Sequence, residues 1–373
     1  MRKLMGKKVI IAVINDISGD QRIHRIASTL AERDFSVLVI GRKLPHSLPL
    51  TPRIYETHRM KLWFVRGKWF YLEYNLRLLF FLLRHRAAII NANDLDTLGA
   101  CFLASKIKRT ELVYDSHEYF TEVPELVDRP FTRKLWLLLE GWIFPRLKKV
   151  YTVNKAIASI YSEKYGVQVG VVRNLPFARE IAQPVPKSNI LLYQGALNIG
   201  RGLELMIEAM VYLPEFTLKI AGRGDIEKHL AEKVEKNRVK NVHLTGFISP
   251  EALHQLTVTA TLGLSLEEDL GANYRFASPN KVFDYIQAGV PVLVSDLPVM
   301  REVVESTGTG EILPSEMRTA ERLAVVIREM VGDRERMEKL RENCRKTARL
   351  LTWENEKEIL LKYYSATYPI ETK

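Results

Sequence analysis

The chain has 373 residues, of which 47% are hydrophobic and 27% are charged, and its formal net charge is +11. This composition is typical of folded globular proteins and excludes disordered, collagen-like and disulfide-scaffold classes. At roughly 100 to 200 residues per domain, the length predicts two domains. The two cysteines, Cys101 and Cys344, belong to no cluster with metal-site spacing, so we expect a cytoplasmic protein without a zinc or disulfide framework.

Short β-branched runs alternate with longer helical patterns along the first half of the chain. The basic start of the chain resembles a signal peptide, but the apolar run ends after six residues at Asn15-Asp16, so a buried strand is expected there. The sequence contains no run of about 18 apolar residues, so we expect no transmembrane helix. Strands are predicted at residues 9–14, 36–41, 88–92, 111–115, 150–154 and 169–173, and helices at 21–32 and 95–107 among the connections.

The same rhythm restarts after a Pro-rich link at residues 174–188. This pattern predicts an α/β protein with two doubly wound Rossmann-like domains, residues 1–186 and 187–352, and a C-terminal helical segment 353–373 that crosses back to the first domain. Ligands bind such folds at the carboxyl ends of the strands, so a site is expected in a cleft between the domains. The predicted elements are strands at 190–194, 217–221, 242–245, 261–265 and 290–294 and a final helix at 353–368.

The basic excess is confined to the first half of the chain. Residues 1–186 carry 30 basic and 17 acidic side chains, a net charge of +13, whereas residues 187–373 carry 25 and 27, a net charge of −2. A field of one sign on one half favours an anionic partner such as nucleic acid, an acidic membrane surface or a phosphorylated acceptor. A role in solubility alone would spread the charge over both halves.

Residues 59–86 combine seven basic residues, one acidic residue and eight aromatic residues. This mixture is typical of a helix that lies at a membrane interface. A core helix before the third strand explains the apolar stretch 78–83 equally well, and the two interpretations can apply to opposite faces. Single-stranded nucleic acid also suits the mixture, but no RNA-binding motif accompanies it, so nucleic acid is not the expected partner.

Polar loops follow several of the predicted strands in the first half. The turn at residues 15–22 contains Gly19, and the neighbouring Asp20, Arg22 and Arg25 belong either to a site or to a solvated first helical turn. Near residue 95, Asp94-Leu-Asp96 resembles an Asp-x-Asp metal motif. Because it opens a predicted helix, where acidic residues act as caps and complement the dipole, we expect no metal site there.

Residues 113–122, Val-Tyr-Asp-Ser-His-Glu-Tyr-Phe-Thr-Glu, run from a buried strand into a polar loop. A single histidine is more often structural than functional. Here the acidic Asp115 and Glu118 flank His117 at the carboxyl end of a strand, and this setting favours a functional role.

Glycine-rich turns follow the first two strands predicted in the second half. The segment 191–204 has glycines at 195, 200 and 202 around Arg201. Such glycines let the backbone approach a diphosphate closely, and an arginine can bind its oxygens in bidentate fashion. Gly222 lies in a similar Gly-Arg-Gly turn, which often does no more than lead a strand into a helix.

The segment 276–295 carries the strongest signal for an anion site. Ser278 is predicted as a helix N-cap with Pro279 at the first helical position, so the free N–H groups of that turn point outward. Lys281 stands in the first turn, where a cation opposes the helix dipole, and this mismatch favours binding of a phosphate. Asp284 follows about one turn later on the same side, where a carboxylate can accept two ribose hydroxyls. An ordinary amphipathic helix explains the apolar residues of the segment but not Lys281 and Asp284.

These motifs resemble those of the retaining glycosyltransferases of the GT4 group, which have the GT-B fold of two Rossmann-like domains. In that family a Glu is followed, after seven residues, by a second Glu and then by a small-residue run that ends in Gly-x-Pro-Val. Asp284, five residues before Gly289, stands at the second acidic position, whereas Phe276 stands at the first. The resemblance extends along nearly the whole chain and describes a subgroup with Ser-Pro-Asn-Lys before the aromatic and acidic pair.

The resemblance implies an enzyme that moves a sugar from a nucleoside-diphosphate sugar to a hydroxyl of a lipid-linked or polysaccharide acceptor, with retained configuration and with no metal or other cofactor. It implies catalytic roles for His117, Arg201 and Lys281. In the segment 245–251 it implies contact with the nucleotide base, although a strand that leads to a helix N-cap at Ser249 explains this segment equally well. The implied donor-binding residues are Gly19, Gly195, Arg201, Gly222, Phe247, Ser278, Asn280, Lys281 and Asp284.

Partner and location follow from the same considerations. The N-terminal half is expected on the acceptor side, with peripheral contact to the inner face of an anionic membrane. Two other functions stay open. A nucleotide-sugar epimerase of the same fold would use His117, Glu118 and Glu122 as acid and base, and a non-catalytic anion or nucleic-acid binder would use the basic half.

Overall fold

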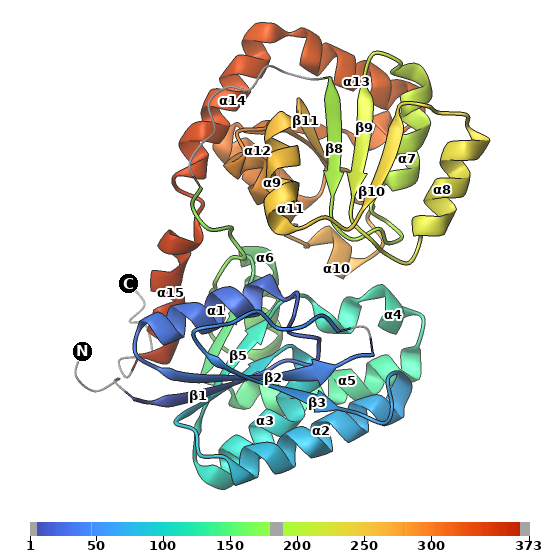
Figure 1. Cartoon of the computed structure of the whole chain (residues 1–373). Coiled ribbons are helices and arrows are strands. Elements are labelled where there is room, and N and C mark those ends of the chain that lie inside the picture. The colour runs from blue at the N-terminus through green and yellow to red at the C-terminus, as the bar shows by residue number, and fades with distance from the viewer. Residues whose placement is uncertain (1–5, 46, 180–188, 279, 366–373) are drawn as a thin grey trace. The chain divides into compact units, whose positions relative to one another are not determined.

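The structure, a computed structural model, describes residues 6–45, 47–179, 189–278 and 280–365. The chain divides into two compact units (Figure 1). Unit 1 comprises Met1–Asn174 and Asn355–Lys373, and unit 2 comprises Leu175–Glu354. The division therefore falls at the start of the Pro-rich link predicted at residues 174–188, of which residues 180–188 lie outside the described part.

The described part of unit 1 forms a seven-stranded parallel sheet in the order β3-β2-β1-β4-β5-β6-β7. The order reverses between β1 and β4, and ligands of open α/β sheets bind beside such a reversal, at the carboxyl ends of the strands. The strands are β1 Lys8–Ala12, β2 Ser36–Lys43, β3 Glu56–Lys61, β4 Ile89–Asn93, β5 Glu111–Ser116, β6 Lys149–Thr152 and β7 Gly170–Val171.

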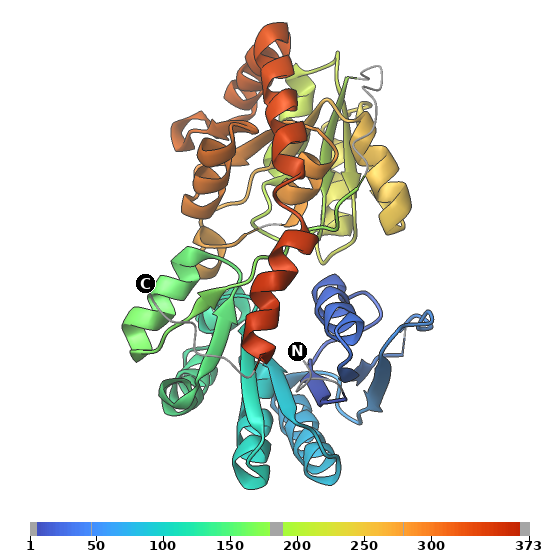
Figure 2. The same cartoon turned by 90° about the vertical axis from the view of Figure 1, so that its left-hand side faces the viewer.

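Helices cover both faces of this sheet. Figures 1 and 2 show α1 and α15 on one face, and α2, α3 and α5 on the other. α6 packs against α5, because its Lys164 bonds to Glu140 of that helix. The helices are α1 Gln21–Glu32, α2 Gly67–Arg84, α3 Leu95–Lys108, α4 Pro124–Val127, α5 Pro130–Ile143, α6 Lys155–Tyr165 and α15 Trp353–Tyr364, with short 3-10 turns η1 Phe120–Glu122 and η2 Phe144–Arg146.

The described part of unit 2 forms a six-stranded parallel sheet in the order β10-β9-β8-β11-β12-β13. Its strands are β8 Ile190–Gln194, β9 Thr217–Ala221, β10 Val242–Gly246, β11 Leu262–Ser265, β12 Val292–Ser295 and β13 Gly310–Leu313. Its helices are α7 Leu203–Ala209, α8 Glu227–Lys236, α9 Pro250–Thr259, α10 Ala272–Arg275, α11 Asn280–Gln287, α12 Pro298–Thr307, α13 Ala320–Gly332 and α14 Arg334–Ala348, with 3-10 turns η3 Met210–Tyr212 and η4 Ser315–Met317.

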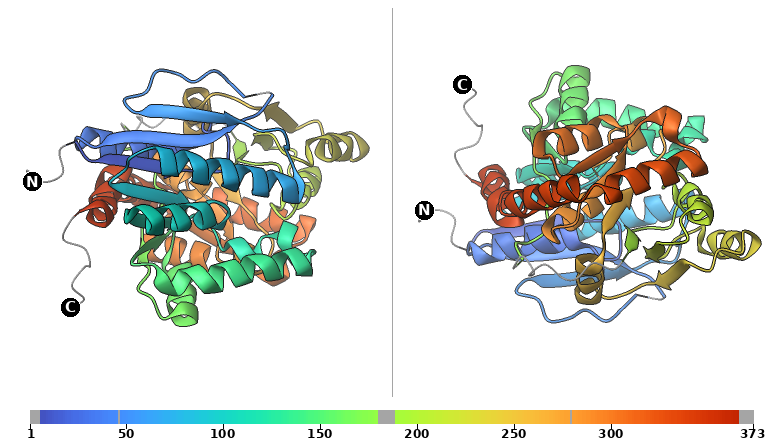
Figure 3. Two further views of the ribbon diagram at one scale, coloured as in Figure 1. Left: turned by 90° about the horizontal axis from the view of Figure 1, so that it is seen from below. Right: turned by 90° about the horizontal axis from the view of Figure 1, so that it is seen from above.

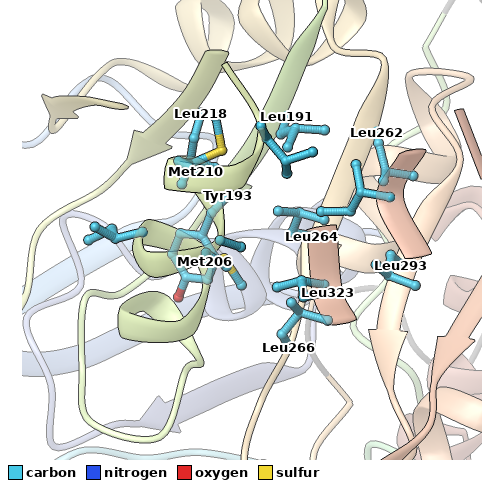
Figure 4. Packing of buried hydrophobic residues seen from close by; sticks show 14 of the residues in the cluster. Leu191, Tyr193, Met206, Met210, Leu218, Leu262, Leu264, Leu266, Leu293 and Leu323 are labelled. Atoms are coloured by element: carbon cyan, nitrogen blue, oxygen red, sulfur yellow. The ribbon is translucent and has the colours of Figure 1, made fainter. Parts of the chain in front are cut away.

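Alternate residues of the central strand β8 pack into two separate hydrophobic cores of unit 2. Leu191 and Tyr193 of β8 pack into a cluster with residues of α7 and α13 on one face, and several members of this cluster are drawn in Figure 4. Leu192 of the same strand belongs to a second cluster with Val282 and Tyr285 of α11 on the other face. Because successive side chains of a strand point to opposite faces, a strand that is buried on both faces is apolar throughout.

The sequence predicted most of this architecture. All of the predicted strands are present, and β8, β9 and α1 have the predicted bounds. The final helix, predicted to reach residue 368, ends at Tyr364 within the described residues, and 366–368 lie outside them. Two further strands, β3 and β13, were not predicted, and both lie at sheet edges. Among the described helices, none is long and apolar enough to cross a membrane.

The C-terminal helix α15 is fixed to unit 1 by one buried carboxylate. Glu356 accepts hydrogen bonds from the backbone N–H of Arg173 at 2.7 Å and from the Arg173 guanidinium at 2.8 and 3.0 Å. On the same helix, the Tyr363 ring lies 4.9 Å from the ring of Tyr151 in β6. Its hydroxyl also fills the space that a side chain at Gly170 would need.

Replacing Glu356 by Gln removes the charge from this buried position and weakens its bonds to Arg173. We expect the free energy of unfolding of unit 1 to fall by about 1 to 3 kcal/mol, measured by urea denaturation. The matched control is Glu358→Gln on the same helix, whose partner Arg33 is exposed and whose loss changes stability little. Equal effects of the two substitutions would contradict the anchoring role of Glu356.

Candidate functional site

Three glycine turns pack together at the carboxyl ends of β8, β9 and β10. Gly195 and Gly222 follow β8 and β9, with φ angles of +137° and +147°. The Gly195 N–H donates to the Ala221 carbonyl at 2.9 Å, and the Gly222 N–H donates to Gly246 at 3.0 Å. A Cβ at position 222 would lie 1.8 Å from the Gly195 carbonyl oxygen. The contact between the two turns therefore requires glycine at position 222. Gly195 also lies beside Lys281.

A buried carboxylate at the carboxyl end of β11 holds two cations. The Glu267 Oε1 atom lies 2.6 Å from the Nζ atom of Lys281 and 3.7 Å from the Nη1 atom of Arg201. Its Oε2 atom accepts a hydrogen bond from Ser265 at 2.8 Å. Glu267 and Lys281 are buried, while Arg201 is partly exposed. Because one carboxylate faces two cations, this triad carries one net positive charge.

The surroundings of the triad fix its charged groups in place. The Nζ atom of Lys281 lies 4.2 Å from the centre of the Tyr193 ring, and the Arg201 guanidinium lies 5.1 Å from the Tyr274 ring. Such cation–π contacts are attractive. A Cβ at Gly195 would lie 3.3 Å from the Cε atom of Lys281, so the β8 turn runs directly over this side chain.

Glu267 was not predicted as a site residue, and its contact with Lys281 changes the interpretation of that lysine. From sequence alone, a lysine in the first turn of α11 has no stabilising reason, but Glu267 provides one. Burial alone would raise the pKa of Glu267, but the charge and hydrogen bond of Lys281, the charge of Arg201 and the hydrogen bond from Ser265 together outweigh it, and the pKa falls below its ordinary value. The available signal was the acidic run Glu267-Glu268-Asp269 directly after a buried strand.

Asp284 is linked to the end of β8 by hydrogen bonds through the Gln194 side chain. The Gln194 side chain donates to Asp284 Oδ2 at 3.2 Å and accepts from the Thr257 hydroxyl at 2.7 Å. Tyr285, the next residue of α11, accepts from the Gln194 N–H at 3.1 Å and donates to the Leu192 carbonyl at 2.9 Å. The Asp284 carboxylate is half-buried, and the Gln194 side chain holds it in position.

The remaining predicted residues of unit 2 lie at the same edge of the sheet. Asn280 is the first residue of α11, and Ser278 precedes it by two positions. Pro279, predicted at the first helical position, lies outside the described residues. Phe247 follows β10 with an exposed side chain. The Ser249 side chain accepts from the Ala252 N–H at the start of α9, so the alternative prediction of an N-cap here is confirmed.

Unit 1 contains a second charged cluster at the carboxyl ends of β4 and β5. The Arg22 guanidinium donates to both carboxylate oxygens of the buried Asp115, at 2.7 and 3.0 Å. The Oδ2 atom of Asp115, which accepts from Arg22 Nε, also lies 3.1 Å from the Nε2 atom of His117. The His117 Nδ1 atom lies 3.3 Å from Asp94, which also accepts the His117 backbone N–H at 2.7 Å. Two cationic and two anionic side chains thus alternate along one chain of contacts.

This arrangement keeps His117 protonated. Burial alone would lower its pKa, but the charges of Asp94 and Asp115 outweigh it and raise the pKa to about 9. The pKa of Asp115 is held below its ordinary value, because the Arg22 and His117 charges outweigh the effect of burial. Both ring nitrogens of His117 face carboxylates, so the imidazolium is a fixed positive charge rather than a free general base.

Two interpretations from the sequence are wrong at this cluster. Asp94 was expected to cap α3, but its side chain makes no capping hydrogen bond there and binds His117 instead. The alternative of a solvated first turn of α1 fails for Arg22 and Arg25, which are both buried. Asp20, by contrast, accepts from the Ile23 N–H as the N-cap of α1.

The contacts of Gly19 and of the two acidic residues proposed for an epimerase, Glu118 and Glu122, do not by themselves indicate a binding site. Gly19 is exposed, and a Cβ at its position would meet nothing within 4 Å. Space and backbone conformation therefore do not require glycine there. Glu122 forms an ion pair with Arg133. Glu118 accepts a hydrogen bond through its backbone carbonyl from the Ser116 hydroxyl at 2.9 Å.

Comparison with protein families identifies both units. A model described as "Glycosyltransferase Family 4" matches residues 20–175, and one described as "Glycosyl transferases group 1" matches residues 176–349. The chain belongs to this family of glycosyltransferases. The junction between the matches lies one residue from the division of the structure. The resemblance predicted from the motifs around Arg201, Lys281 and Asp284 is thus confirmed at the level of the family.

Individual relatives are distant. A chitobiosyldiphosphodolichol beta-mannosyltransferase of Yarrowia lipolytica is 29% identical over 109 residues, which are 29% of this chain and 23% of that protein. The chain therefore matches less than a quarter of the length of this curated relative.

Solved structures confirm the GT-B fold. Sucrose-phosphate synthase from Thermosynechococcus elongatus has a TM-score of 0.79 at 17% identity, with 96% of this chain and 98% of that chain covered. Anabaena HepE, in complex with UDP and glucose, has a TM-score of 0.75 at 16% identity, with 96% and 100% covered. WaaG, a glycosyltransferase involved in lipopolysaccharide biosynthesis, has a TM-score of 0.72 at 18% identity over the same shares of the two chains.

Because the pKa of His117 is raised, we expect its contribution to the free energy of unfolding to depend on pH. The folded protein holds this proton more tightly than the unfolded chain, so the contribution is complete below about pH 6.5 and is lost as the pH rises through about 9. The difference in unfolding free energy between wild type and His117→Gln should shrink by on the order of 2 kcal/mol from pH 6 to pH 10.

Urea denaturation at stepped pH measures this difference, and the exposed His243→Gln is the matched control. Groups that titrate in both proteins cancel in the comparison. A difference that stays constant across the range would show that folding does not raise the pKa of His117.

Proposed function

We propose that this chain transfers a sugar from a nucleoside-diphosphate sugar to a hydroxyl of a lipid-linked or polysaccharide acceptor, with retention of configuration. The observation that carries the proposal is the Glu267–Lys281–Arg201 triad. Its net positive charge lies beside glycine turns at the carboxyl edge of a parallel sheet, where α/β folds bind ligands. Membership of the glycosyltransferase family supports the choice of a sugar nucleotide as the anion.

Each predicted donor contact has a place in this proposal. Arg201 and Lys281 bind the diphosphate together with the backbone of the Gly195 turn. The half-buried Asp284 accepts hydroxyls of the ribose, since Gln194 holds its carboxylate in position. The exposed Phe247 lies against the base. Gly222 supports the Gly195 turn from behind, and Ser278 and Asn280 lie at the start of α11.

The chemistry proposed for the triad is stabilisation of the leaving group. Breaking the anomeric bond leaves extra negative charge on the departing diphosphate, and cations fixed there beforehand lower the barrier. Glu267 holds these cations without cancelling them, because one carboxylate balances only one of the two. We propose that the chain's own cations perform this role and that no metal ion or other cofactor is needed.

Retention is proposed to proceed by attack on the same face as the leaving group. The departing phosphate then accepts the proton of the acceptor hydroxyl, so no carboxylate nucleophile is required. The buried carboxylates Asp115 and Glu267 and the partly buried Asp94 are all engaged by cations, which is consistent with this route. For His117 the proposed role is a fixed positive charge at the carboxyl edge of unit 1.

Acceptor and location are proposed from the relatives and the charge distribution. The mannosyltransferase relative is named for a dolichol-linked diphosphate, and WaaG is described as acting in lipopolysaccharide biosynthesis. A lipid-linked acceptor suits the +13 charge of residues 1–186, which favours anionic surfaces. We propose a cytoplasmic enzyme with peripheral contact to the inner face of the membrane through its N-terminal half.

A thermal-shift screen with UDP-, GDP- and ADP-sugars tests the donor. A compound that binds only the folded state raises the apparent melting temperature, so we expect one of the three classes to stabilise the protein at millimolar concentration. Incubation with the stabilising compound alone distinguishes the epimerase, because that enzyme changes sugar stereochemistry without an acceptor. Stabilisation by none of the three classes would contradict the proposed function.

Variants of the triad separate its structural role from its catalytic role. Lys281→Met alone leaves Glu267 buried beside a single cation, whereas the double variant Lys281→Met/Glu267→Gln removes both charges of the buried pair. We expect this double variant and Arg201→Ala to remain folded and to lower kcat/KM by on the order of 100-fold or more. Arg301→Ala, which removes an exposed arginine of the same unit, should leave turnover unchanged. Unaltered turnover in both test variants would refute the assignment.

A further inference from the structure

Helices α2, α3 and α5 form one continuous layer on unit 1. Figure 3 (left) shows them side by side. Asn75 of α2 donates to the Asp96 carbonyl of α3 at 2.8 Å, and Phe102 of α3 contacts Trp142 of α5 with ring centres 5.4 Å apart. Tyr71 of α2 also contacts Trp136 of α5, at 5.4 Å. These contacts join the three helices into a single surface, which we call the outer helical face.

The outer helical face is apolar where it meets water. On α2 the residues Phe70, Tyr74, Leu78 and Leu82 are buried against the sheet, and a second apolar stripe lies on the opposite side. The exposed apolar residues of the three helices have exposed fractions from 41% to 75% and follow helical spacing. They are Trp69, Leu72, Leu76 and Phe80 on α2, Leu103 and Ile107 on α3, and Phe131, Leu135, Leu138 and Trp142 on α5.

The loop before α2 adds aromatic side chains held in an exposed position. The Trp63 side chain is 84% exposed. Its backbone N–H donates to Glu73 of α2 at 3.0 Å, and that of Phe64 does so at 2.9 Å. Arg77, which pairs with Glu73 at 2.7 Å, also lies 4.7 Å from the Trp63 ring centre. The loop is therefore fixed to the helix, and Trp63 projects into solvent in a preformed position.

The charges on this face have one sign. All residues of α2, α3 and α5 are described, and these helices contain seven Lys or Arg and three acidic residues. None of the three acidic side chains is exposed, because Asp96 and Glu140 are buried and Glu73 is only 9% exposed. Asp128, in the loop before α5, is an exposed acid at the rim. Water therefore meets apolar and cationic side chains together on the outer helical face.

A basic cavity opens where α3 and α5 end. It has a volume of about 870 Å³, and its lining includes Lys106, Arg109, Arg146, Lys148 and Lys149 with the single acid Glu111. Glu111 pairs with Lys149, which leaves four positive charges in excess. The Arg146 guanidinium lies 5.9 Å from the Trp142 ring centre, so the cavity is continuous with the outer helical face. Four cations beside an apolar surface match the phosphate groups that lie just above the acyl chains of a bilayer.

We propose that the outer helical face docks on an anionic lipid bilayer. The apolar stripes and Trp63 enter the interface, the basic side chains reach the headgroups, and the basic cavity takes lipid phosphates. An uncharged protein partner would leave the cationic excess without a complement, whereas an anionic membrane satisfies both features. This inference deepens the membrane contact proposed above and does not depend on the identity of the donor.

Vesicle flotation of the full chain tests the docking, without nucleotide or acceptor. We expect binding to vesicles of phosphatidylcholine with phosphatidylglycerol, weaker binding at high salt, and little binding to phosphatidylcholine alone. The variant Trp69→Ser/Leu76→Ser/Leu138→Ser should lower the partition coefficient at least about tenfold. The matched control Val211→Ser/Val325→Ser/Leu350→Ser replaces exposed apolar residues of unit 2 and should bind as wild type does. The variant Arg109→Glu/Lys148→Glu removes two cations of the basic cavity and should bind anionic vesicles more weakly than wild type. Its control, Lys228→Glu/Lys236→Glu, makes the same charge change on α8 of unit 2 and should bind as wild type does.

Thermal unfolding and donor-induced stabilisation of each variant verify that it is folded, so a failure of docking is distinguishable from a failure of sugar transfer. Three outcomes would overturn the proposal. They are the absence of binding to anionic vesicles, equal binding by the face variant and its control, and a wild-type dimer that becomes monomeric in the face variant without any vesicle binding. The last outcome would assign the face to a second copy of this chain.

Discussion

A charge buried away from water is stable only beside an opposite charge, and this constraint organises the carboxyl edges of both sheets. In unit 1 two cations, Arg22 and His117, meet two carboxylates, and the cluster is balanced internally. In unit 2 the two cations Arg201 and Lys281 meet the single carboxylate of Glu267. Only the second cluster has charge left over, so it is the one that an anionic ligand can complete.

Most of the strands that were predicted from sequence are central strands buried on both faces, and the edge strands β7 and β10 were predicted as well. A central parallel strand such as β8, Ile-Leu-Leu-Tyr-Gln, is apolar up to its last residue because each face packs on a helical layer. The two missed strands lie at edges. β3 reads Glu-Thr-His-Arg-Met-Lys and has one buried residue, while β13 has four residues and begins with glycine. Charged or short edge strands protect a sheet from pairing with another chain, and the same features remove the apolar pattern that reveals a strand.

For the candidate site, the sequence indicated which residues carry chemistry but not which residues hold them. Arg201, Lys281 and His117 stand in recognisable local motifs. Their partners do not, because Glu267 is 14 residues from Lys281 and Asp115 is 93 residues from Arg22. Such pairs are set by the order of the strands in the sheet and by the helices that pack on it. The helix dipole alone therefore left Lys281 without a counter-charge. Glu267 supplies this charge from the end of β11, the neighbour of β12 in the sheet.

The two interpretations of residues 59–86, a core helix and an interfacial helix, apply to different sides of α2. The inner stripe of Phe70, Tyr74, Leu78 and Leu82 is sufficient to attach the helix to the sheet. The outer stripe adds nothing to that packing, and a helix in an ordinary α/β layer would carry polar residues there. α3 and α5 repeat the same departure, and the exposed acids that normally accompany surface lysines and arginines are absent from the described residues of all three helices. Because the fold explains only the inner stripes, the composition of the outer helical face requires a partner that is both apolar and anionic.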